Sequence, residues 1–292
     1  MFVIRNFGGM TWKELLTRTW RQLWNDRVSD QSATLSFYFL LSLFPLLLFL
    51  SALMGLLLQS NSVTQGVLYR YLATILPPSA SSLIDTTLGE ITRGANPFKL
   101  SIALLFLWWS AAQGMLAIIE GLNIAYKVEA TRSWWRKYAV ASGLTIVFLL
   151  LAAAALLLLL YGERLSEIVA SHVDFGGSVV RIWKVLRWFL VLAFVLMAFN
   201  ILYVYAPNVR HREWHWLMPG TVVGVSLWLL ASGGFQLYLR FFNQFTVTYG
   251  TIGAVIILLL WFYLSGIAFL VGAEVNSVIE GASNQIRRND RR

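Results

Sequence analysis

Six long stretches of the chain are apolar and almost free of charged residues. They are residues 33–58, 100–119, 138–161, 185–206, 217–239 and 251–273. Each has about 20 residues or more, which lets a helix rising about 1.5 Å per residue cross a hydrocarbon layer of roughly 30 Å. Backbone groups in lipid must be paired internally, so each stretch is expected to be a helix. The pattern therefore predicts an all-α, polytopic membrane protein with six transmembrane helices.

Amphipathic segments accompany these spans. Between residues 11 and 28, apolar side chains recur at helical spacing with basic residues between them, and this indicates a helix that lies either on the membrane or on the protein's own cytoplasmic face. The first external connection, residues 59–99, predicts short amphipathic helices broken at Pro77-Pro78. We expect three parts, which are a cytoplasmic amphipathic N-terminal segment (1–32), a six-helix transmembrane domain (33–275) and a basic cytoplasmic tail (276–292).

Composition supports this organisation. Of the 292 residues, 58% are hydrophobic and only 13% are charged, whereas a soluble domain carries about 25% charged residues. Six spans and their connections use nearly the whole sequence, so no separate soluble catalytic domain is expected. The absence of cysteine excludes disulfides and thiolate metal sites.

Lysine and arginine are distributed unevenly about the six spans. The side that holds both termini carries more of them than the other side, although the third connection is also basic. The positive-inside rule places both termini in the cytoplasm. The net charge of +9 is then explained by topology and by contact with anionic lipid headgroups rather than by nucleic acid, which we do not expect as a partner.

Polar residues cluster at the predicted cytoplasmic ends of the spans. The candidates for a polar pocket or a coupling site are Asp30, Glu120, Asn123, Glu274 and Asn276. Ionisable groups at membrane depth are costly, which favours a site for a cation, a proton or a polar headgroup. The alternative is a set of interfacial hydrogen bonds and ion pairs that fix the helices in register.

Two further features concern the helices themselves. Pro45 lies inside the first span, where the loss of a backbone donor predicts a kink and makes it a candidate hinge. Gly220 and Gly224 form a small-xxx-small pair, which is typical of helices that approach closely.

Motifs for catalysis and metal binding are weak. The segment from His211 to His215 differs from the zinc-protease signature because Glu213 does not directly follow the first histidine. We find no nucleotide-binding loop and no serine nucleophile elbow. We therefore expect no enzyme activity, no catalytic residue, no metal and no cofactor.

Several stretches occur in an order typical of one family. They are Asp30-Gln-Ser-Ala-Thr-Leu-Ser-Phe-Tyr-Phe-Leu-Leu-Ser-Leu-Phe-Pro45, Gly121-Leu-Asn-Ile-Ala-Tyr126 followed by Arg132, Pro219-Gly220 with Trp228, Tyr249-Gly-Thr-Ile-Gly-Ala254, Leu260-Trp-Phe-Tyr-Leu-Ser265 and Gly272-Ala-Glu-Val-Asn276. The chain resembles the YihY/BrkB family of bacterial inner-membrane proteins, formerly labelled ribonuclease BN. The resemblance implies six spans in the bacterial cytoplasmic membrane and an envelope role, and it places the candidate polar residues within family motifs.

The leading hypothesis is transport. A six-helix bundle with a cytoplasm-facing polar pocket would move or export a lipid-like or envelope-related amphiphile, with possible coupling to an ion through Glu120 or Glu274. The alternative is a non-transporting scaffold or partner in envelope assembly. Membrane lipids, with anionic headgroups at the cytoplasmic face, are the expected partners, and a homo-oligomer is possible.

Overall fold

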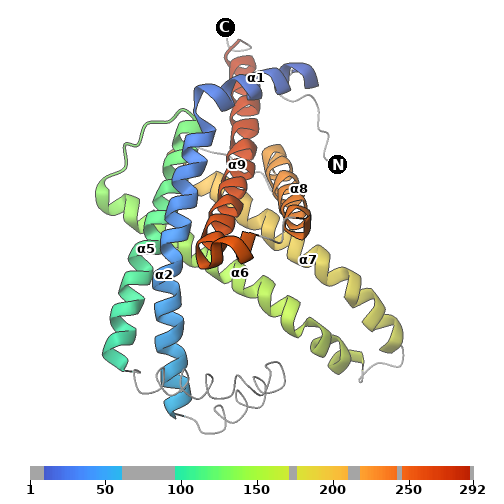
Figure 1. Cartoon of the computed structure of the whole chain (residues 1–292). Helices are drawn as coiled ribbons and strands as arrows, with labels where there is room; N and C mark the ends of the chain where they lie inside the picture. Colours follow the sequence, from blue (N-terminus) through green and yellow to red (C-terminus); the bar gives the residue numbers. More distant parts are fainter. Residues whose placement is uncertain (1–9, 61–95, 171–175, 210–217, 242–244, 290–292) are drawn as a thin grey trace. The chain divides into compact units, whose positions relative to one another are not determined.

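The computed structural model describes residues 10–60, 96–170, 176–209, 218–241 and 245–289. These residues form seven helices and no strand, so the predicted all-α class is confirmed (Figure 1). The helices are α1 (Trp12–Asn25), α2 (Val28–Ser60), α5 (Pro97–Ala125), α6 (Trp134–Ala170), α7 (Gly176–Tyr205), α8 (Pro219–Phe241) and α9 (Phe245–Asn289). The short helices expected in the first external connection and the three histidines lie outside the described residues.

Six of these helices, α2 and α5 to α9, are long and apolar enough to cross a membrane. Each covers all or nearly all of one of the apolar stretches found in the sequence. The helices run further than those stretches, and α9 continues to Asn289, through most of the segment expected as a basic tail. Apolar windows locate the part of a helix that suits lipid, whereas the helix itself ends where backbone hydrogen bonding ends.

The chain divides into two compact units, residues 1–37 with 115–292, and residues 38–114. In the second unit, the Phe39 ring of α2 lies beside Gly114 of α5, where an added Cβ would meet it at 3.5 Å. Pro45 is buried in this unit, and α2 continues as a helix through it. The role of Pro45 as a hinge stays a prediction.

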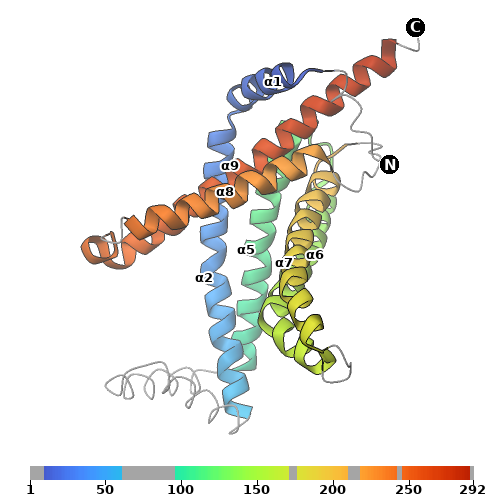
Figure 2. The same cartoon turned by 90° about the vertical axis from the view of Figure 1, so that its right-hand side faces the viewer.

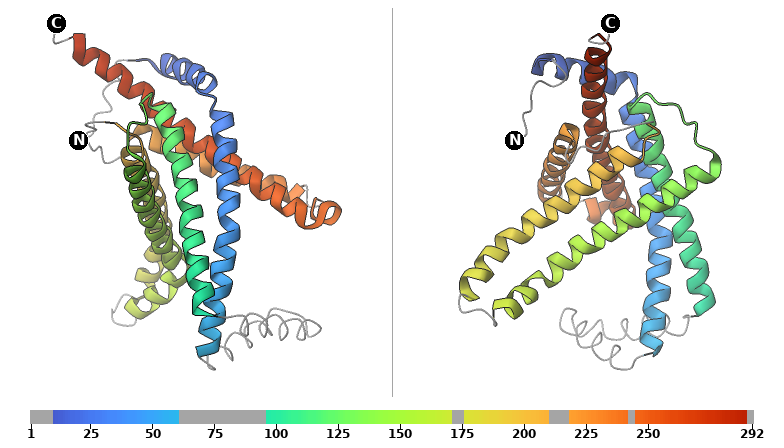
Figure 3. Two further views of the ribbon diagram at one scale, coloured as in Figure 1. Left: turned by 90° about the vertical axis from the view of Figure 1, so that its left-hand side faces the viewer. Right: turned by 180° about the vertical axis from the view of Figure 1, so that it is seen from behind.

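In the first unit, α6 packs along α7, and α8 packs along α9 (Figures 2 and 3). The contact between α8 and α9 is very close because Gly220 and Gly224 face Gly272. A Cβ added at Gly272 would meet the Cα of Gly224 at 3.0 Å, as well as the Gly220 carbonyl oxygen and the Tyr203 hydroxyl. The small-xxx-small pair therefore does bring two helix backbones together, as the sequence predicted.

Tyr203 of α7 fills the centre of this contact. Its side chain is fully buried, and its hydroxyl donates a hydrogen bond to the Phe269 carbonyl oxygen at 2.6 Å. The Tyr203 ring also stacks on the Phe269 ring, with centroids 4.9 Å apart. Glycines on α8 and α9 leave the space that this tyrosine occupies, so helices α7, α8 and α9 share one packed core.

Helix α1 has two separate sets of apolar side chains, one packed on the protein and one exposed. One face packs Leu15 against Val278 and Ala282 of α9. The other face carries an exposed row spaced four residues apart, which we call the tryptophan row: Trp12, Leu16, Trp20 and Trp24, each at least 63% exposed. The sequence left open whether this helix lies on the membrane or on the protein, and one face of it lies on the protein.

Candidate functional site

Helix α1 and the first turns of α2 contact α9 in the reverse order of residues, and this pairing positions the site. Leu15 meets Val278 near the end of α9, Gln22 reaches Glu274 one turn earlier, and Ser32 lies against Gly266. The turn between α1 and α2 makes this possible. Asp26 caps α1, with its N–H donating to the Gln22 carbonyl at 2.8 Å, and Arg27 adopts a left-handed conformation with φ of 48°.

Glu274 is the chemical centre of this region. Its side chain is completely buried, and within the described residues its Oε1 has no hydrogen-bond partner. The Gln22 amide, oriented to satisfy both neighbours, donates from Nε2 to Glu274 Oε2 at 3.1 Å and accepts at Oε1 from Lys127 Nζ at 2.9 Å. Asp26 follows Gln22 by one turn, and its carboxyl group is close enough to act on Glu274 electrostatically. A buried acid is thus linked to a second acid, an amide and an ammonium group.

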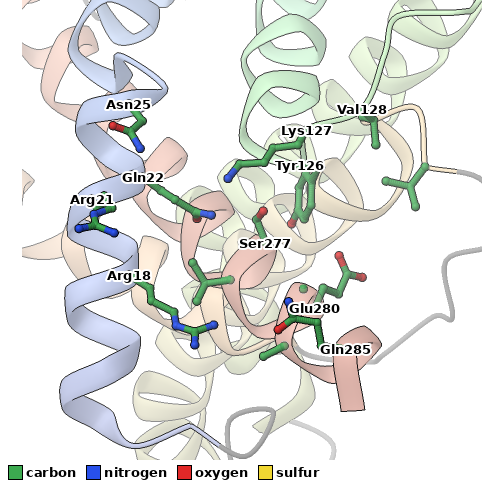
Figure 4. Close-up of a pocket in the computed structure, with 14 residues that line it drawn as sticks. Arg18, Arg21, Gln22, Asn25, Tyr126, Lys127, Val128, Ser277, Glu280 and Gln285 are labelled. Atoms are coloured by element: carbon green, nitrogen blue, oxygen red, sulfur yellow. The ribbon is translucent and has the colours of Figure 1, made fainter. Parts of the chain in front are cut away.

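A pocket of about 570 Å³ opens beside this group (Figure 4). In Figure 4, Gln22 and Lys127 extend toward one another from α1 and from the end of α5. The other lining side chains are Arg18, Arg21, Asn25, Tyr126, Val128, Val209, Ser277, Val278, Glu280, Gly281, Ala282 and Gln285. Three basic groups face one acid here, so the pocket is basic with apolar patches. Arg18 is also held by Glu14, 2.6 Å away on the next turn.

The two candidate asparagines hold the connection between α7 and α8. Asn123 accepts at Oδ1 from the Asn208 N–H at 2.8 Å. Asn276 accepts at Oδ1 from the Gly220 N–H at 2.7 Å, and so pairs one of the free donors in the first turn of α8. Asn200, which is also buried, accepts from the Met218 N–H at 3.3 Å. These amides hold the ends of helices in place. This arrangement agrees with the alternative prediction, in which polar residues at the ends of the spans form hydrogen bonds that fix the helices in register.

The other two candidates are exposed. Asp30 lies in the first turn of α2 and accepts from the Ser29 hydroxyl at 3.3 Å. The Glu120 side chain is 65% exposed, and its nearest cation is Lys137 at 3.8 Å. The structure therefore buries Glu274 next to Gln22, which lines the pocket, and leaves Asp30 and Glu120 on the surface of the same unit.

Arg132 binds backbone carbonyl groups at the end of α7. Its Nη1 donates to the Ala206 carbonyl at 2.8 Å, and its Nη2 donates to the Pro207 carbonyl at 3.0 Å. These carbonyls follow the C-terminal end of α7, where a cation is favourable. Burial lowers the pKa of Arg132, and the charge of Arg136 lowers it further, but a guanidinium stays protonated at neutral pH.

Sequence reasoning missed Gln22, Asp26 and Lys127. Leu15, Gln22 and Asp26 share one face of α1 at spacings of seven and four residues, which was a usable indication that this face packs on something. Lys127 adopts a left-handed conformation with φ of 53° in the turn after α5, and its position follows from that turn. Among the residues that the structure describes, no group of His, Asp and Glu side chains could hold a metal ion.

The comparisons with known proteins agree with the helical architecture. The family described as "Virulence factor BrkB" matches residues 19–292, and the chain belongs to this family of membrane proteins. The chain is 35% identical over 250 residues to the "Putative ribonuclease-like protein YfkH" of Bacillus subtilis, covering 86% of this chain and 89% of the relative.

More distant relatives are described as membrane proteins. A UPF0761 membrane protein of Tolumonas auensis is 27% identical, covering 89% of this chain and 83% of its own length. Another, from Paraburkholderia xenovorans, is 26% identical over 87% of this chain, and the match spans 57% of that relative. No solved structure matches. The protein is a multi-pass integral membrane protein, and its activity has to be argued from the site.

Proposed function

We propose that this protein binds amphiphiles with an anionic headgroup at the cytoplasmic face of the bacterial inner membrane and moves them across it. The single observation that carries the proposal is the basic pocket between α1, the end of α5 and the end of α9. Its volume of about 570 Å³ suits a small-molecule or headgroup site. The excess of basic residues beside both termini supports a cytoplasmic position.

The lining chemistry favours an amphiphile over a simple anion. Arg21 and Lys127 supply positive charge, and Val128, Val209 and Val278 supply apolar surface within the same pocket. A phosphodiester would accept charge-assisted hydrogen bonds from the cations. The glycerol and the upper acyl chain would then contact the valines.

The position of the pocket favours a ligand that arrives from the membrane. The α9 residues that line it begin at Ser277, inside Val255–Ser283, the part of α9 that is long and apolar enough to cross a membrane. A headgroup at this depth stays close to the bilayer interface, so a lipid could reach the pocket without leaving the membrane. A scaffold without transport has no specific observation in its favour here, and it remains an outcome of the test below.

Binding is tested with the purified protein in a neutral detergent and short-chain lipids. Dihexanoyl-phosphatidylglycerol should bind more tightly than dihexanoyl-phosphatidylcholine, as measured by isothermal titration calorimetry. The double variant Arg21→Gln with Lys127→Gln should weaken phosphatidylglycerol binding at least about tenfold, since one hydrogen bond to a charged group contributes about 1.5–3 kcal/mol.

Lys13→Gln is the matched control, because Lys13 lies on the same helix, is exposed and does not line the pocket. It should bind phosphatidylglycerol as the wild type does. Equal affinity for the two lipids, or no loss in the double variant, would contradict the proposal. Binding without movement in liposomes, together with a stable co-purifying protein, would favour the scaffold instead.

A further inference from the structure

The buried acid pair lies directly behind the proposed headgroup pocket. Glu274 has no exposed surface, and Asp26 reaches it from the turn after α1. Glu274 Oε1 and Asp26 Oδ2 are both buried, and neither has a hydrogen-bond partner among the described residues when both groups are treated as acceptors. Two carboxylates cannot hydrogen-bond to each other, but a carboxylate and a carboxylic acid can. A proton shared between the two groups would give both oxygens a hydrogen-bond partner.

The charge balance leads to the same conclusion. Two ionised carboxylates beside one Lys127 ammonium would leave a net negative charge in a buried place, which is unfavourable. One proton on the pair leaves one negative and one positive charge, and Gln22 bridges them at 3.1 and 2.9 Å. When two acids share a site, repulsion between them makes one hold its proton more tightly.

Lys127 takes part both in the network around the acid pair and in the lining of the pocket. It donates to Gln22 on the side of the acid pair, and it lines the pocket that would hold the headgroup. We propose that Asp26 and Glu274 bind a shared proton, and that anion binding in the pocket is linked to proton uptake by this pair through Gln22 and Lys127. The linkage rests on the proposed function, whereas the proton site itself does not.

The direction of the linkage follows from the charges. An anion in the pocket attracts the Lys127 ammonium and weakens its attraction for the acid pair. At a pH high enough for the empty pair to have lost its shared proton, the pair then takes this proton up again from water, so anion and proton bind together. By reciprocity, a lower pH strengthens anion binding. If one proton is taken up for each anion bound, the dissociation constant of the anion falls by about tenfold for each unit by which the pH is lowered. This holds in the pH range where the pair titrates.

Other titratable groups near Glu274 are accounted for. On α9, Glu280 lies two turns further on and lines the pocket. From α5, Tyr126 also lines the pocket, and from α7, Tyr203 donates to the Phe269 carbonyl. From α8, Gly220 and Gly224 contact α9 at Gly272, and from the first turns of α2, Ser32 contacts Gly266. From α1, Arg18 and Arg21 line the pocket, and Asp26 and Lys127 act on Glu274 by charge.

The proton site is tested first, without any ligand. Infrared difference spectra between low and high pH should show a protonated carboxylic acid in the wild type. This band should be lost or shifted in both Glu274→Gln and Asp26→Asn, because each substitution removes one member of the pair. Glu120→Gln is the control, since that side chain is exposed and should leave the band unchanged. A band that survives in both variants would overturn the proton site.

The linkage is tested with dihexanoyl-phosphatidylglycerol, whose phosphodiester does not titrate near neutral pH. Calorimetry in two buffers of different ionisation enthalpy measures the protons taken up on binding. Uptake should approach about one proton per lipid in the wild type and Glu120→Gln, and fall close to zero in Glu274→Gln and Asp26→Asn. Each substitution removes one carboxyl group of the pair, so neither variant can hold a proton shared between two carboxyl groups.

The outcomes separate the two proposals. Lipid binding with unchanged proton uptake in both variants would overturn the linkage and keep the proposed function. A normal infrared result with no lipid binding would overturn the proposed function and keep the proton site. Binding that responds to sodium instead of pH would replace the proton with a metal cation. If Glu274→Gln does not fold, Asp26→Asn, on the partly exposed turn, decides the question.

Discussion

The close contact between α8 and α9 gives a prediction whose size can be worked out from the structure. In Gly272→Ala, the added methyl group would meet the Gly224 Cα at 3.0 Å and would lie closer still to the Gly220 carbonyl and the Tyr203 hydroxyl. Two of these neighbours are backbone atoms, and Tyr203 is held by its hydrogen bond to Phe269. None can move aside easily, so overpacking should cost about 1–3 kcal/mol.

Gly233→Ala on α8 is the matched control, because nothing lies within 4 Å of a Cβ added at Gly233. Both substitutions gain the same preference of alanine for a helix, about 1 kcal/mol, so their difference isolates the clash. Thermal unfolding of the purified variants in one detergent, followed by size-exclusion chromatography, measures it. The apparent midpoint of Gly272→Ala should lie below that of Gly233→Ala by about 2–4 °C per kcal/mol. Equal midpoints would refute the close contact.

Three further predictions concern helix ends and helix α1. Replacing the hydrogen-bond acceptor in Asn276→Leu should destabilise the protein by about 1–3 kcal/mol in the same assay, since the buried Gly220 N–H is left unpaired, and full stability would contradict this role. Arg132→Gln should lower the unfolding midpoint and Arg136→Gln should not, because only Arg132 binds the carbonyls after α7; equal midpoints would refute the cap. Trp20 of the tryptophan row should be quenched by lipids brominated near the headgroup more strongly than by lipids brominated at the chain end, in a variant retaining Trp20 as its only tryptophan, and equal quenching would exclude an interfacial position.

The architecture was predictable from the sequence because lipid leaves the backbone few choices. Each apolar stretch had to form a helix, and all or nearly all of each one is helical. The ends of the helices were less predictable, as α9 shows. Towards its C-terminal end, α9 is amphipathic, with Val278 and Ala282 packed on Leu15. Polar residues lie between these apolar ones, so a search for uniformly apolar windows ends before the helix does.

The candidate site was predicted only in part. Sequence gives the depth of a polar residue along a span but not which neighbour it faces. Glu120 and Glu274 both end a span, yet one is exposed and the other fully buried. The partners of Glu274 could not be identified in the same way. Asp26 lies outside the spans and reaches Glu274 only because α1 turns back along α9, which is a tertiary contact.

If the pocket at the α1 end of α9 handles anionic amphiphiles, the protein should move them between the two leaflets of a membrane. Movement of fluorescently labelled phosphatidylglycerol in proteoliposomes tests it most directly, with labelled phosphatidylcholine and protein-free liposomes as controls. The wild type and Lys13→Gln should move phosphatidylglycerol, and the double variant Arg21→Gln with Lys127→Gln should not. Movement that is absent in the wild type, or that is unchanged in the double variant, would contradict the account.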